Sequence, residues 1–421
     1  MKIGPFAAKH QTSIDTIRHY MSLGLLFPEK NGVQYDFDEN CSKDYAQIVE
    51  LKKIGFTLSE IQQLILYRRI GKLTEYDQRS TYLSFFEKKK AHIEEDIQKL
   101  VEMKMQLSAA IDEMTFKQKD VQQRPEATLG LALKSLELLA CPFCHTSYSI
   151  SEGAIQKGVL VDARLSCRCD QELHVMEGIV YTREVILQNS TPLDFGSIEQ
   201  YSENYIDEYI NTTHIDYLKK LHAGLTWSSR HISTAALEGK VALELGSGHG
   251  YFMRHMMDWF PENSTYIAVD HNPVKLKWLK QILERHHPKC NILFLCADFK
   301  QLPLKHRCVD ALLDISGSSN YAFDHTDFLL HRVDPLLKEN ATLHGYYILF
   351  DNFVKHSKIS LAYREGFKLN KIKSELSLLG YVCTDELLTE PVEKGGPLED
   401  YFVEGECVRT YLYTGYKIKK P

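Results

Sequence analysis

The stretch Val241-Ala242-Leu243-Glu244-Leu245-Gly246-Ser247-Gly248-His249-Gly250 predicts a buried strand that runs directly into a glycine-rich turn. The strand should end at Leu245, and a helix should begin near Tyr251. A strand, turn and helix of this kind cradle part of a nucleoside cofactor, because glycine allows a sharp turn and lets a ligand approach the backbone closely. The sequence around this stretch therefore predicts an α/β, Rossmann-like domain.

The spacing of the glycines distinguishes between cofactors. A dinucleotide fingerprint reads G-x-G-x-x-G and brings a helix N-terminus to a pyrophosphate. Here the glycines fall at positions 246, 248 and 250, and Glu244 lies two residues before the first of them. A carboxylate at that turn would repel phosphate but would suit a cation. S-adenosylmethionine is cationic at its sulfonium and amino groups and has no phosphate, so the sequence favours it as the cofactor.

Acidic residues also end the next three predicted strands. Asp270 follows the strand at 266–269, about 20 residues after the glycines, where a carboxylate can accept both ribose hydroxyls. Asp298 is a candidate to accept the adenine amino group, with Phe299 against the ring, and Asp314 ends a fourth strand. The predicted cofactor-binding residues are Glu244, Gly246, Ser247, Gly248, Gly250, Asp270, His271, Asp298, Phe299 and Asp314.

On these motifs, roughly residues 200–420 resemble class I methyltransferases that use S-adenosylmethionine. The resemblance implies a cofactor bound at the edge of a mostly parallel sheet. The alternative is an unrelated βαβ unit with a glycine turn. Glu244, Asp270 and Asp298, each at the end of its own strand, weigh against that alternative.

The whole chain has the composition of a multidomain protein. At 421 residues it should hold two or three domains, and its net charge of −6 means that any nucleic-acid contact must be a local patch. The start shows no signal-peptide core, and no apolar run approaches the roughly 18 residues of a membrane helix. The ten cysteines are scattered apart from one cluster, so we expect a cytoplasmic protein without a membrane partner.

The N-terminal residues predict a winged helix-turn-helix. Short helices are expected at 3–9 and 14–23, with Ser13 capping the second, and Asn31-Gly32 signals the hairpin of a wing. A second helical pair should follow at 45–54 and 58–67. The second helix of such a motif enters a DNA major groove. The predicted DNA-binding residues are Ser13, Thr16, Arg18, His19, Tyr20 and Tyr35.

These residues resemble the MerR family of transcription regulators. The match runs through Ile3-Gly4, 16–20, 23–26, Tyr35 and 51–61. It departs from the family at Gln11-Thr12, where Gly-Val is usual, and at Met21, where an acid is usual. The resemblance implies binding to a double-stranded promoter operator. The alternative is a helix-turn-helix kept for protein contacts.

A long helix is predicted at about 81–116. Its apolar residues step by three and four positions, which is typical of a coiled-coil seam, and Lys90 and Lys104 interrupt it. In the resembling family this helix pairs with its copy, so we expect a homodimer. The alternative is that this helix packs against its own domain, with Tyr82 and Phe85 as the candidate contact residues.

Four cysteines predict a small metal site. Cys141 and Cys144 form a Cys-x-x-Cys turn, and Cys167 and Cys169 form a shorter Cys-x-Cys turn. Two such turns can complete a tetrahedral zinc site, with His145 or His174 replacing Cys169 if that thiol cannot reach. The segment at 138–180 resembles the small zinc ribbon found ahead of some methyltransferase domains, including rRNA guanine methyltransferases. A ribbon packed without metal is the alternative.

The predicted domains are a winged helix-turn-helix (1–76), a dimerisation helix (77–116), a linker (117–137), a zinc ribbon (138–183) and a methyltransferase domain (184–421). Tyr201, Tyr205, Tyr209 and Tyr217 precede the first strand of that last domain and either cover the cofactor or are half-buried amphipathic positions. The candidates to face a methyl acceptor are Asp314, Ser318, Asn320 and Tyr321. No motif of the DNA-base methylating enzymes is present.

Three functions fit these features. The first is a DNA-binding regulator that also methylates a small molecule. The second is a regulator that uses an inactive methyltransferase fold to sense S-adenosylmethionine or another ligand. The third is an RNA methyltransferase with nucleic-acid targeting modules. The presence of all three carboxylates favours the first.

Overall fold

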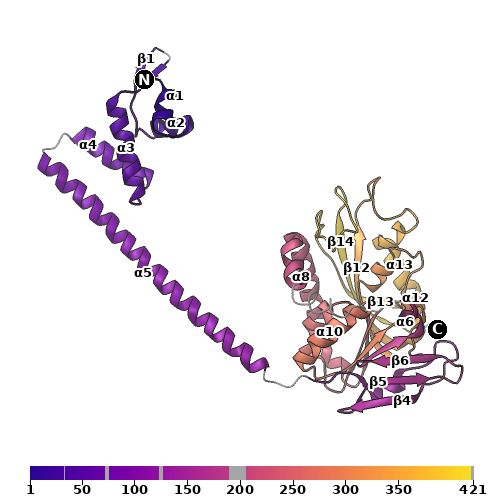
Figure 1. The fold of residues 1–421 in the computed structure, drawn as a ribbon. Helices are drawn as coiled ribbons and strands as arrows, with labels where there is room; N and C mark the ends of the chain where they lie inside the picture. The colour runs from indigo at the N-terminus through magenta and orange to yellow at the C-terminus, as the bar shows by residue number, and fades with distance from the viewer. Residues whose placement is uncertain (33, 72–74, 123–126, 189–204, 419–421) are drawn as a thin grey trace. The chain divides into compact units, whose positions relative to one another are not determined.

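The computed structural model describes residues 1–32, 34–71, 75–122, 127–188 and 205–418. The chain divides into two units, residues 1–124 and 125–421 (Figure 1). The predicted multidomain class is confirmed, because the first unit is mostly helical with one long helix and the second is built on a mixed, Rossmann-like sheet. Among the described residues, none of the helices combines the length and apolar character that a membrane crossing needs.

The first unit is the predicted helix-turn-helix with a wing. Its elements are α1 (Ile3–Lys9), α2 (Ile14–Ser22), β1 (Glu29–Asn31), β2 (Gln34–Asp36), α3 (Glu39–Lys53) and α4 (Leu58–Gly71). Phe6 stacks on Phe37 at 4.5 Å between ring centroids, and Ile17 is fully buried beside them. Gln11 in the turn has φ of 50°, a left-handed conformation that glycine adopts most easily. That conformation explains why the family usually has glycine there.

The long helix α5 (Glu75–Gln122) has 48 residues and extends past both predicted ends. Its first turns pack on the helix-turn-helix unit, where Phe86 lies 5.2 Å from Phe56 and Lys89 forms an ion pair with Glu60. Tyr82 and Phe85 also pack against that core. Further along, the seam is open to solvent in the single chain, with exposed Ile93, Ile97, Leu100, Leu107, Ile111 and Met114.

The second unit contains the predicted Rossmann-like strands. They are β8 (Val241–Leu245), β9 (Thr265–Asp270), β10 (Asn291–Cys296), β11 (Val309–Ile315) and β12 (Leu337–Phe350), followed by β13 (Tyr381–Leu388) and β14 (Val408–Lys417). The order is β13-β14-β12-β11-β8-β9-β10, with β14 antiparallel to both neighbours and the central strands parallel. The predicted antiparallel pair at the end of the chain is therefore present. The strand order reverses beside β8, because β9 and β10 are added on one side of it and β11 and β12 on the other, and such sheets bind ligands at this point.

Helices cover both faces of this sheet. They are residues 205–212, α6 (Arg183–Gln188), α8 (Ile215–His231), α9 (Tyr251–Met256), α10 (Pro273–His286), α11 (Gly317–Tyr321), α12 (Leu330–Val333) and α13 (Leu369–Leu378). Alternation along β8 sends Leu243 and Leu245 into one core cluster and Ala242 into the other. Glu244 lies on the same face as Ala242, so its carboxylate enters an otherwise apolar layer.

The cysteine-bearing segment continues the same sheet. Its strands are β3 (Leu131–Ala132), β4 (Ser149–Gln156), β5 (Val159–Ser166), β6 (Glu172–Met176) and β7 (Ile179–Thr182). Strand β7 pairs in parallel with β10, where Val180 is opposite Leu295 and Tyr181 is opposite Cys296. Val180 and Leu295 share one hydrophobic cluster. The ribbon is thus part of the second unit and extends its sheet to twelve strands.

Candidate functional site

A cavity of about 520 Å³ lies at the carboxyl ends of the central parallel strands. Seven of the ten predicted cofactor-binding residues line it, namely Glu244, Gly246, Ser247, Gly248, Asp270, His271 and Phe299. Residues from α8, α11, β12 and the 398–399 loop complete its wall. The structure therefore gathers most of the predicted set around one space.

The glycine-rich turn needs glycine for two different reasons. Gly246, Gly248 and Gly250 all have positive φ, at 71°, 51° and 65°. A Cβ added at Gly246 or Gly248 would meet no protein atom closer than 3.5 Å, so these two leave open backbone beside the cavity. A Cβ at Gly250 would lie 2.3 Å from Leu279 on α10. Gly250 does not line the cavity and instead allows close helix packing.

Glu244 is a buried carboxyl group beside the cavity. Its side chain is 2% exposed, and no hydrogen-bond partner of its Oε2 atom lies within the described part of the chain. Burial raises the pKa of Glu244 to about 7, and the nearby charge of Asp270 adds to the rise. The ionised form would be stabilised by a cation in the cavity.

Asp270 is held by the backbone around the turn. Its Oδ2 atom accepts a hydrogen bond from the Gly248 N–H and its Oδ1 atom accepts one from the Asn272 N–H, both at 2.8 Å. The Asn272 side chain in turn caps α10. His271 is exposed and its Nδ1 atom lies 3.6 Å from Asp270 Oδ1. The carboxylate is fixed at the cavity wall with remaining acceptor capacity for hydroxyl groups.

Two predicted carboxylates lie outside the wall of the cavity. Asp298 accepts a hydrogen bond from the Lys300 N–H at 2.9 Å and caps the short turn that carries Phe299 into the wall. Asp314 is fully buried and accepts a hydrogen bond from the Ser318 N–H at 2.8 Å. Burial raises the pKa of Asp314 to about 6. Each holds the start of a turn or helix that contributes to the wall.

Tyrosines from the segment before β8 cover one side of the cavity. Tyr205 and Tyr209, on the helix at 205–212, both line it, while Tyr201 lies outside the described residues. Tyr205 stacks on His249 at 3.9 Å between ring centroids. Tyr217 does not line the cavity and its hydroxyl contacts that of Tyr401 at 2.8 Å. Two of the tyrosines singled out from the sequence are thus part of the wall.

Only one of the four residues expected to face a methyl acceptor lines the cavity. Asn320 lines the cavity, whereas Ser318 and Tyr321 do not. Tyr346 on β12 and Glu399 in the loop before β14 also line it, although neither is predicted from the sequence. No local motif marks either position, because their place in the wall depends on the pairing of β12 with β14.

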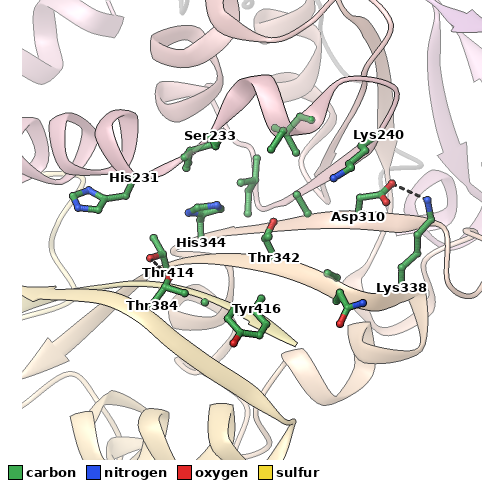
Figure 2. Close-up of a pocket in the computed structure, with 18 of the residues that line it drawn as sticks. His231, Ser233, Lys240, Asp310, Lys338, Thr342, His344, Thr384, Thr414 and Tyr416 are labelled. Carbon is green, nitrogen blue, oxygen red and sulfur yellow. Dashed lines mark hydrogen bonds and ion pairs between the residues drawn. The ribbon is translucent and has the colours of Figure 1, made fainter. Parts of the chain in front are cut away.

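A second cavity, of about 300 Å³, lies at the amino ends of the same strands (Figure 2). Figure 2 shows His344 at its centre, with Lys240 and the Asp310–Lys338 ion pair at one end. None of the predicted cofactor-binding residues lines it. This cavity lies at the edge of the sheet opposite the glycine turn, so it is distinct from the candidate cofactor site.

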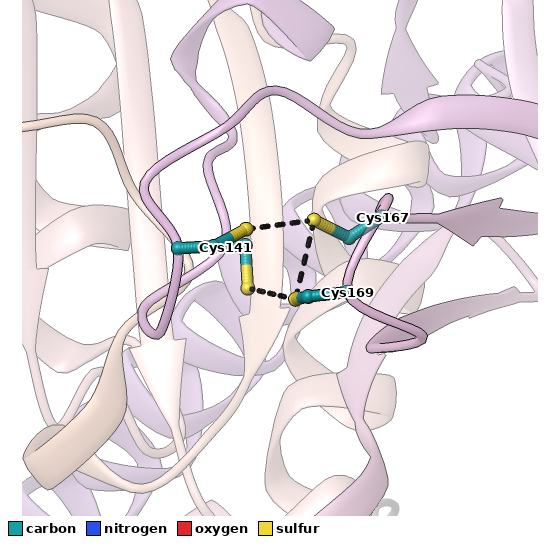
Figure 3. Close-up of side chains that lie close together, drawn as sticks. Cys141, Cys167 and Cys169 are labelled. Carbon is teal, nitrogen blue, oxygen red and sulfur yellow. Dashed lines mark hydrogen bonds between the residues drawn. The ribbon is translucent and has the colours of Figure 1, made fainter.

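The four predicted metal-ligating cysteines lie together (Figure 3). Their sulfur atoms all fall within 4.8 Å of one another, with Cys141 to Cys169 at 3.5 Å and Cys144 to Cys167 at 3.2 Å. Four sulfurs at about 2.3 Å from a tetrahedral zinc ion would be about 3.8 Å apart. The cluster is therefore close to the size that a metal ion needs.

Turns and hydrogen bonds hold the thiols in place. The Cys141 N–H donates to the Thr146 carbonyl and the Cys167 N–H donates to the Gln171 carbonyl, at 2.9 and 2.8 Å. The hydroxyl oxygen of Thr146 lies 3.0 Å from Cys144 Sγ, as expected for a group that orients a ligand. Cys169 reaches the cluster despite the shorter spacing. The two histidines considered as replacements are not among its members.

Of the predicted DNA-binding residues, Ser13, Arg18, His19 and Tyr35 are exposed and Thr16 is half-buried, so all but one are open to solvent. Ser13 caps α2 by accepting a hydrogen bond from the Thr16 N–H at 3.0 Å, and Arg18 is exposed beside Asp15. The wing strands pair Lys30 with Tyr35, and Tyr35 is exposed. His19 is also exposed on α2.

Tyr20 is the exception. The expectation that it lies on the outward face of α2 is wrong, because its side chain is 4% exposed. It lies three residues after Ile17, on the face that packs against α3, and its hydroxyl is 3.5 Å from Lys52 Nζ.

Comparison with known families agrees with both units. Residues 1–67 match the model of the MerR HTH family regulatory protein, and residues 46–110 match that of the MerR DNA-binding domain. Residues 242–340 match a methyltransferase domain model. The chain therefore joins MerR-type DNA-binding regulator domains to a methyltransferase domain.

Solved structures with partial similarity cover just under half of the chain. The MccD protein has 12% identity and a TM-score of 0.37, over 46% of this chain and 96% of that one. The YcgJ protein of Bacillus subtilis has 13% identity and a TM-score of 0.34, over 47% and 100%. An arsenic(III) S-adenosylmethionine methyltransferase of Chlamydomonas reinhardtii has 15% identity and a TM-score of 0.33, over 46% and 74%. These scores are too low to add to the family models, and no curated protein matches the chain.

We predict that the purified full chain carries one tightly bound metal ion, measured by elemental analysis. Cys144→Ser and Cys167→Ser should each lower metal content and the unfolding temperature, because each removes one of four thiolate ligands. Cys383→Ser is the matched control, since that exposed cysteine lies outside the cluster. Metal-free protein that unfolds at the same temperature as protein supplied with zinc would contradict the prediction.

We predict that affinity for S-adenosylmethionine rises by up to about tenfold between pH 6 and pH 8. With a pKa of about 7, Glu244 is mostly protonated at pH 6 and mostly ionised at pH 8, and a cationic ligand favours the ionised form. Glu244→Gln should bind more weakly at pH 8 and lose this dependence in calorimetric titrations. The exposed Glu262→Gln variant should behave as wild type, and an unchanged pH dependence in Glu244→Gln would refute the assignment.

Proposed function

We propose that this chain is a transcription regulator that binds promoter DNA as a homodimer and methylates a small molecule with S-adenosylmethionine. The observation that carries the enzymatic half is the shared cavity, where the open backbone of the glycine turn meets Glu244 and Asp270. A buried carboxyl group without a cation nearby is costly, so this edge of the sheet is suited to a cationic nucleoside. The matching methyltransferase domain model supports the same reading.

In this proposal some of the predicted residues contact the cofactor and others support the cavity wall. Asp270 would accept the ribose hydroxyls, and Phe299 would pack against the adenine, with Asp298 fixing its turn. Gly246 and Gly248 would let the cofactor approach the backbone, and Glu244 would favour its positive charge. The cofactor supplies a methyl group activated by the sulfonium. Gly250 and Asp314 act through packing and capping.

The protein's own contribution is to position the acceptor and exclude water. Methyl transfer needs the acceptor atom in line with the carbon–sulfur bond, and orientation alone can supply much of the rate. Tyr205 and Tyr209 cover the cavity from one side, and Tyr346 closes it from the sheet. The ring of Tyr346 lies so close to Gly224 that a Cβ there would be 2.4 Å away. This close packing suits a small acceptor.

The four-cysteine cluster is proposed to hold zinc with a structural role. Four thiolates complete a tetrahedron and leave no open position for a substrate. The pairing of β7 with β10 connects the ribbon directly to the strand that precedes Asp298. Bound zinc would therefore stabilise one flank of the methyltransferase sheet.

Dimerisation is proposed to occur through α5. Its seam from Ile93 to Met114 is exposed in the single chain, and a face of this length and pattern is stable when paired with another helix. A dimer would double the phosphate contacts of a DNA-binding head that carries little net charge. With DNA as its partner and ribbon cysteines that form no disulfide, the protein is proposed to work in the cytoplasm.

Incubation of the protein with methyl-labelled S-adenosylmethionine and fractionated cell extract tests the enzymatic half. We expect label in the small-molecule fraction, and Asp270→Asn should transfer less because the ribose loses its acceptor. Label in RNA would instead support an RNA methyltransferase. Bound cofactor without any transfer would support a regulator that only senses it, and either result contradicts the proposal.

Arg18→Ala should weaken binding to duplexes selected from a random library by the wild-type protein. Arg18 is exposed on α2, and loss of one base contact costs about 1–3 kcal/mol, or roughly 5- to 150-fold in affinity. Fluorescence anisotropy measures the change. Lys117→Ala, which removes an exposed positive charge at the far end of α5, should bind normally. Equal binding by the Arg18→Ala protein would remove α2 from the DNA interface.

A further inference from the structure

A third buried carboxylate lines the cofactor cavity besides Glu244 and Asp270. Glu399, in the loop before β14, is 7% exposed and lines the cavity. Its Oε2 atom accepts hydrogen bonds from the Gly396 N–H at 3.1 Å and the Thr213 hydroxyl at 3.4 Å. Nothing in the cofactor assignment uses this group. A buried carboxylate held by neutral donors is stabilised further when a cation binds beside it.

The protein itself does not supply that cation in ion-pair contact. Within the described ranges, no lysine, arginine or histidine nitrogen forms an ion pair with Glu399. Burial lowers the pKa of Lys220 to about 8 and the charge of Glu399 offsets part of this, but the Lys220 Nζ atom donates to Thr410 Oγ1 at 3.2 Å and lies over the Tyr217 ring. Lys275 and Arg254 act on His249, at the glycine turn. Within the ranges that the structure describes, Glu399 therefore has hydrogen-bond donors but no cation in ion-pair contact.

Aromatic faces accompany this carboxylate. Tyr205, Tyr209 and Tyr251 form a cluster with ring centroids 5.5 to 6.5 Å apart, and Tyr346 lines the same cavity. The hydroxyl of Tyr346 is buried and has no hydrogen-bond partner in the part of the chain that the structure describes. Burial, followed by a hydrogen bond to Glu399, raises the pKa of Tyr209, so its ring stays a neutral phenol. Tyrosine faces attract ammonium groups, and the attraction grows when water is excluded.

We infer that the methyl acceptor is a small amine, recognised as an ammonium group by Glu399 and the surrounding tyrosines. The inference rests on the proposed methyltransferase function and adds its substrate class. An ammonium group beside Glu399 would add a favourable charge interaction to the hydrogen bonds from Gly396 and Thr213, which a neutral or anionic acceptor would not.

Methyl transfer to such an amine needs one proton acceptor, and Glu399 can serve as that acceptor. The bound ammonium first gives a proton to the Glu399 carboxylate and becomes a neutral amine. Its nitrogen lone pair then forms the new nitrogen–carbon bond while the carbon–sulfur bonding pair passes to sulfur. The products are a methylated ammonium and S-adenosylhomocysteine, and the proton on Glu399 leaves to solvent.

The test uses a pair of probes that differ only in charge. Choline and its neutral isostere 3,3-dimethylbutan-1-ol are titrated into the full chain saturated with S-adenosylhomocysteine, with binding followed by calorimetry or ligand-observed NMR. We expect choline to bind at least about tenfold more tightly than the isostere. Glu399→Gln should abolish that preference, and Glu404→Gln, an exposed glutamate in the same loop, should retain it.

A second variant keeps the inference testable if Glu399→Gln unfolds. Tyr209→Leu retains the carboxylate but removes one ring, and should lower choline affinity by about three- to tenfold. Equal or undetectable binding of both probes to the wild type would overturn the inference. So would a Glu399→Gln protein that binds S-adenosylhomocysteine weakly but prefers choline normally, because Glu399 would then serve the cofactor. Failure of the wild type to bind S-adenosylhomocysteine at all would instead refute the proposed function.

Discussion

The second unit buries a carboxyl group near the end of its central strand, and the chemistry of its cavity depends on that group. Glu244 lies on the β8 face that is otherwise filled by apolar side chains, and burial raises its pKa to about 7. A rise of this size corresponds to about 3 kcal/mol against the ionised form. The protonated form stabilises the folded state fully below the ordinary pKa of glutamate, and this contribution is lost as the pH rises through about 7. A cation in the cavity removes that penalty, so cofactor binding and stability are linked.

The sheet connects this site to the rest of the unit. Strand β10 pairs with β9 on one side and with β7 of the cysteine ribbon on the other, so the ribbon and the cofactor site share a continuous set of backbone hydrogen bonds. The ribbon is therefore an edge of the methyltransferase sheet and not a separate domain. Strand β12 and the loop before β14 also line the cavity, through Tyr346 and Glu399. Residues from both halves of one sheet thus meet around one space.

Much of this could be predicted from the sequence, because strand ends and glycine turns are local signals. Glu244 is the next-to-last residue of β8 and Asp270 is the last residue of β9, and both line the cavity as expected. Asp298 was placed there by the same reasoning, but it turns back to cap the residues that follow it. Tyr20 was placed on the outward face of α2, although its spacing from Ile17 puts both on the buried face. Glu399 has no local signal, since only the pairing of distant strands brings its loop to the site.

The most direct test of this account is a calorimetric titration of the full chain at pH 8 with S-adenosylmethionine, S-adenosylhomocysteine and a dinucleotide. The account predicts one site per chain for the two adenosyl ligands and no binding of the dinucleotide, because Glu244 beside the glycine turn disfavours a pyrophosphate. Binding of the dinucleotide, or no heat with either adenosyl ligand, would contradict it.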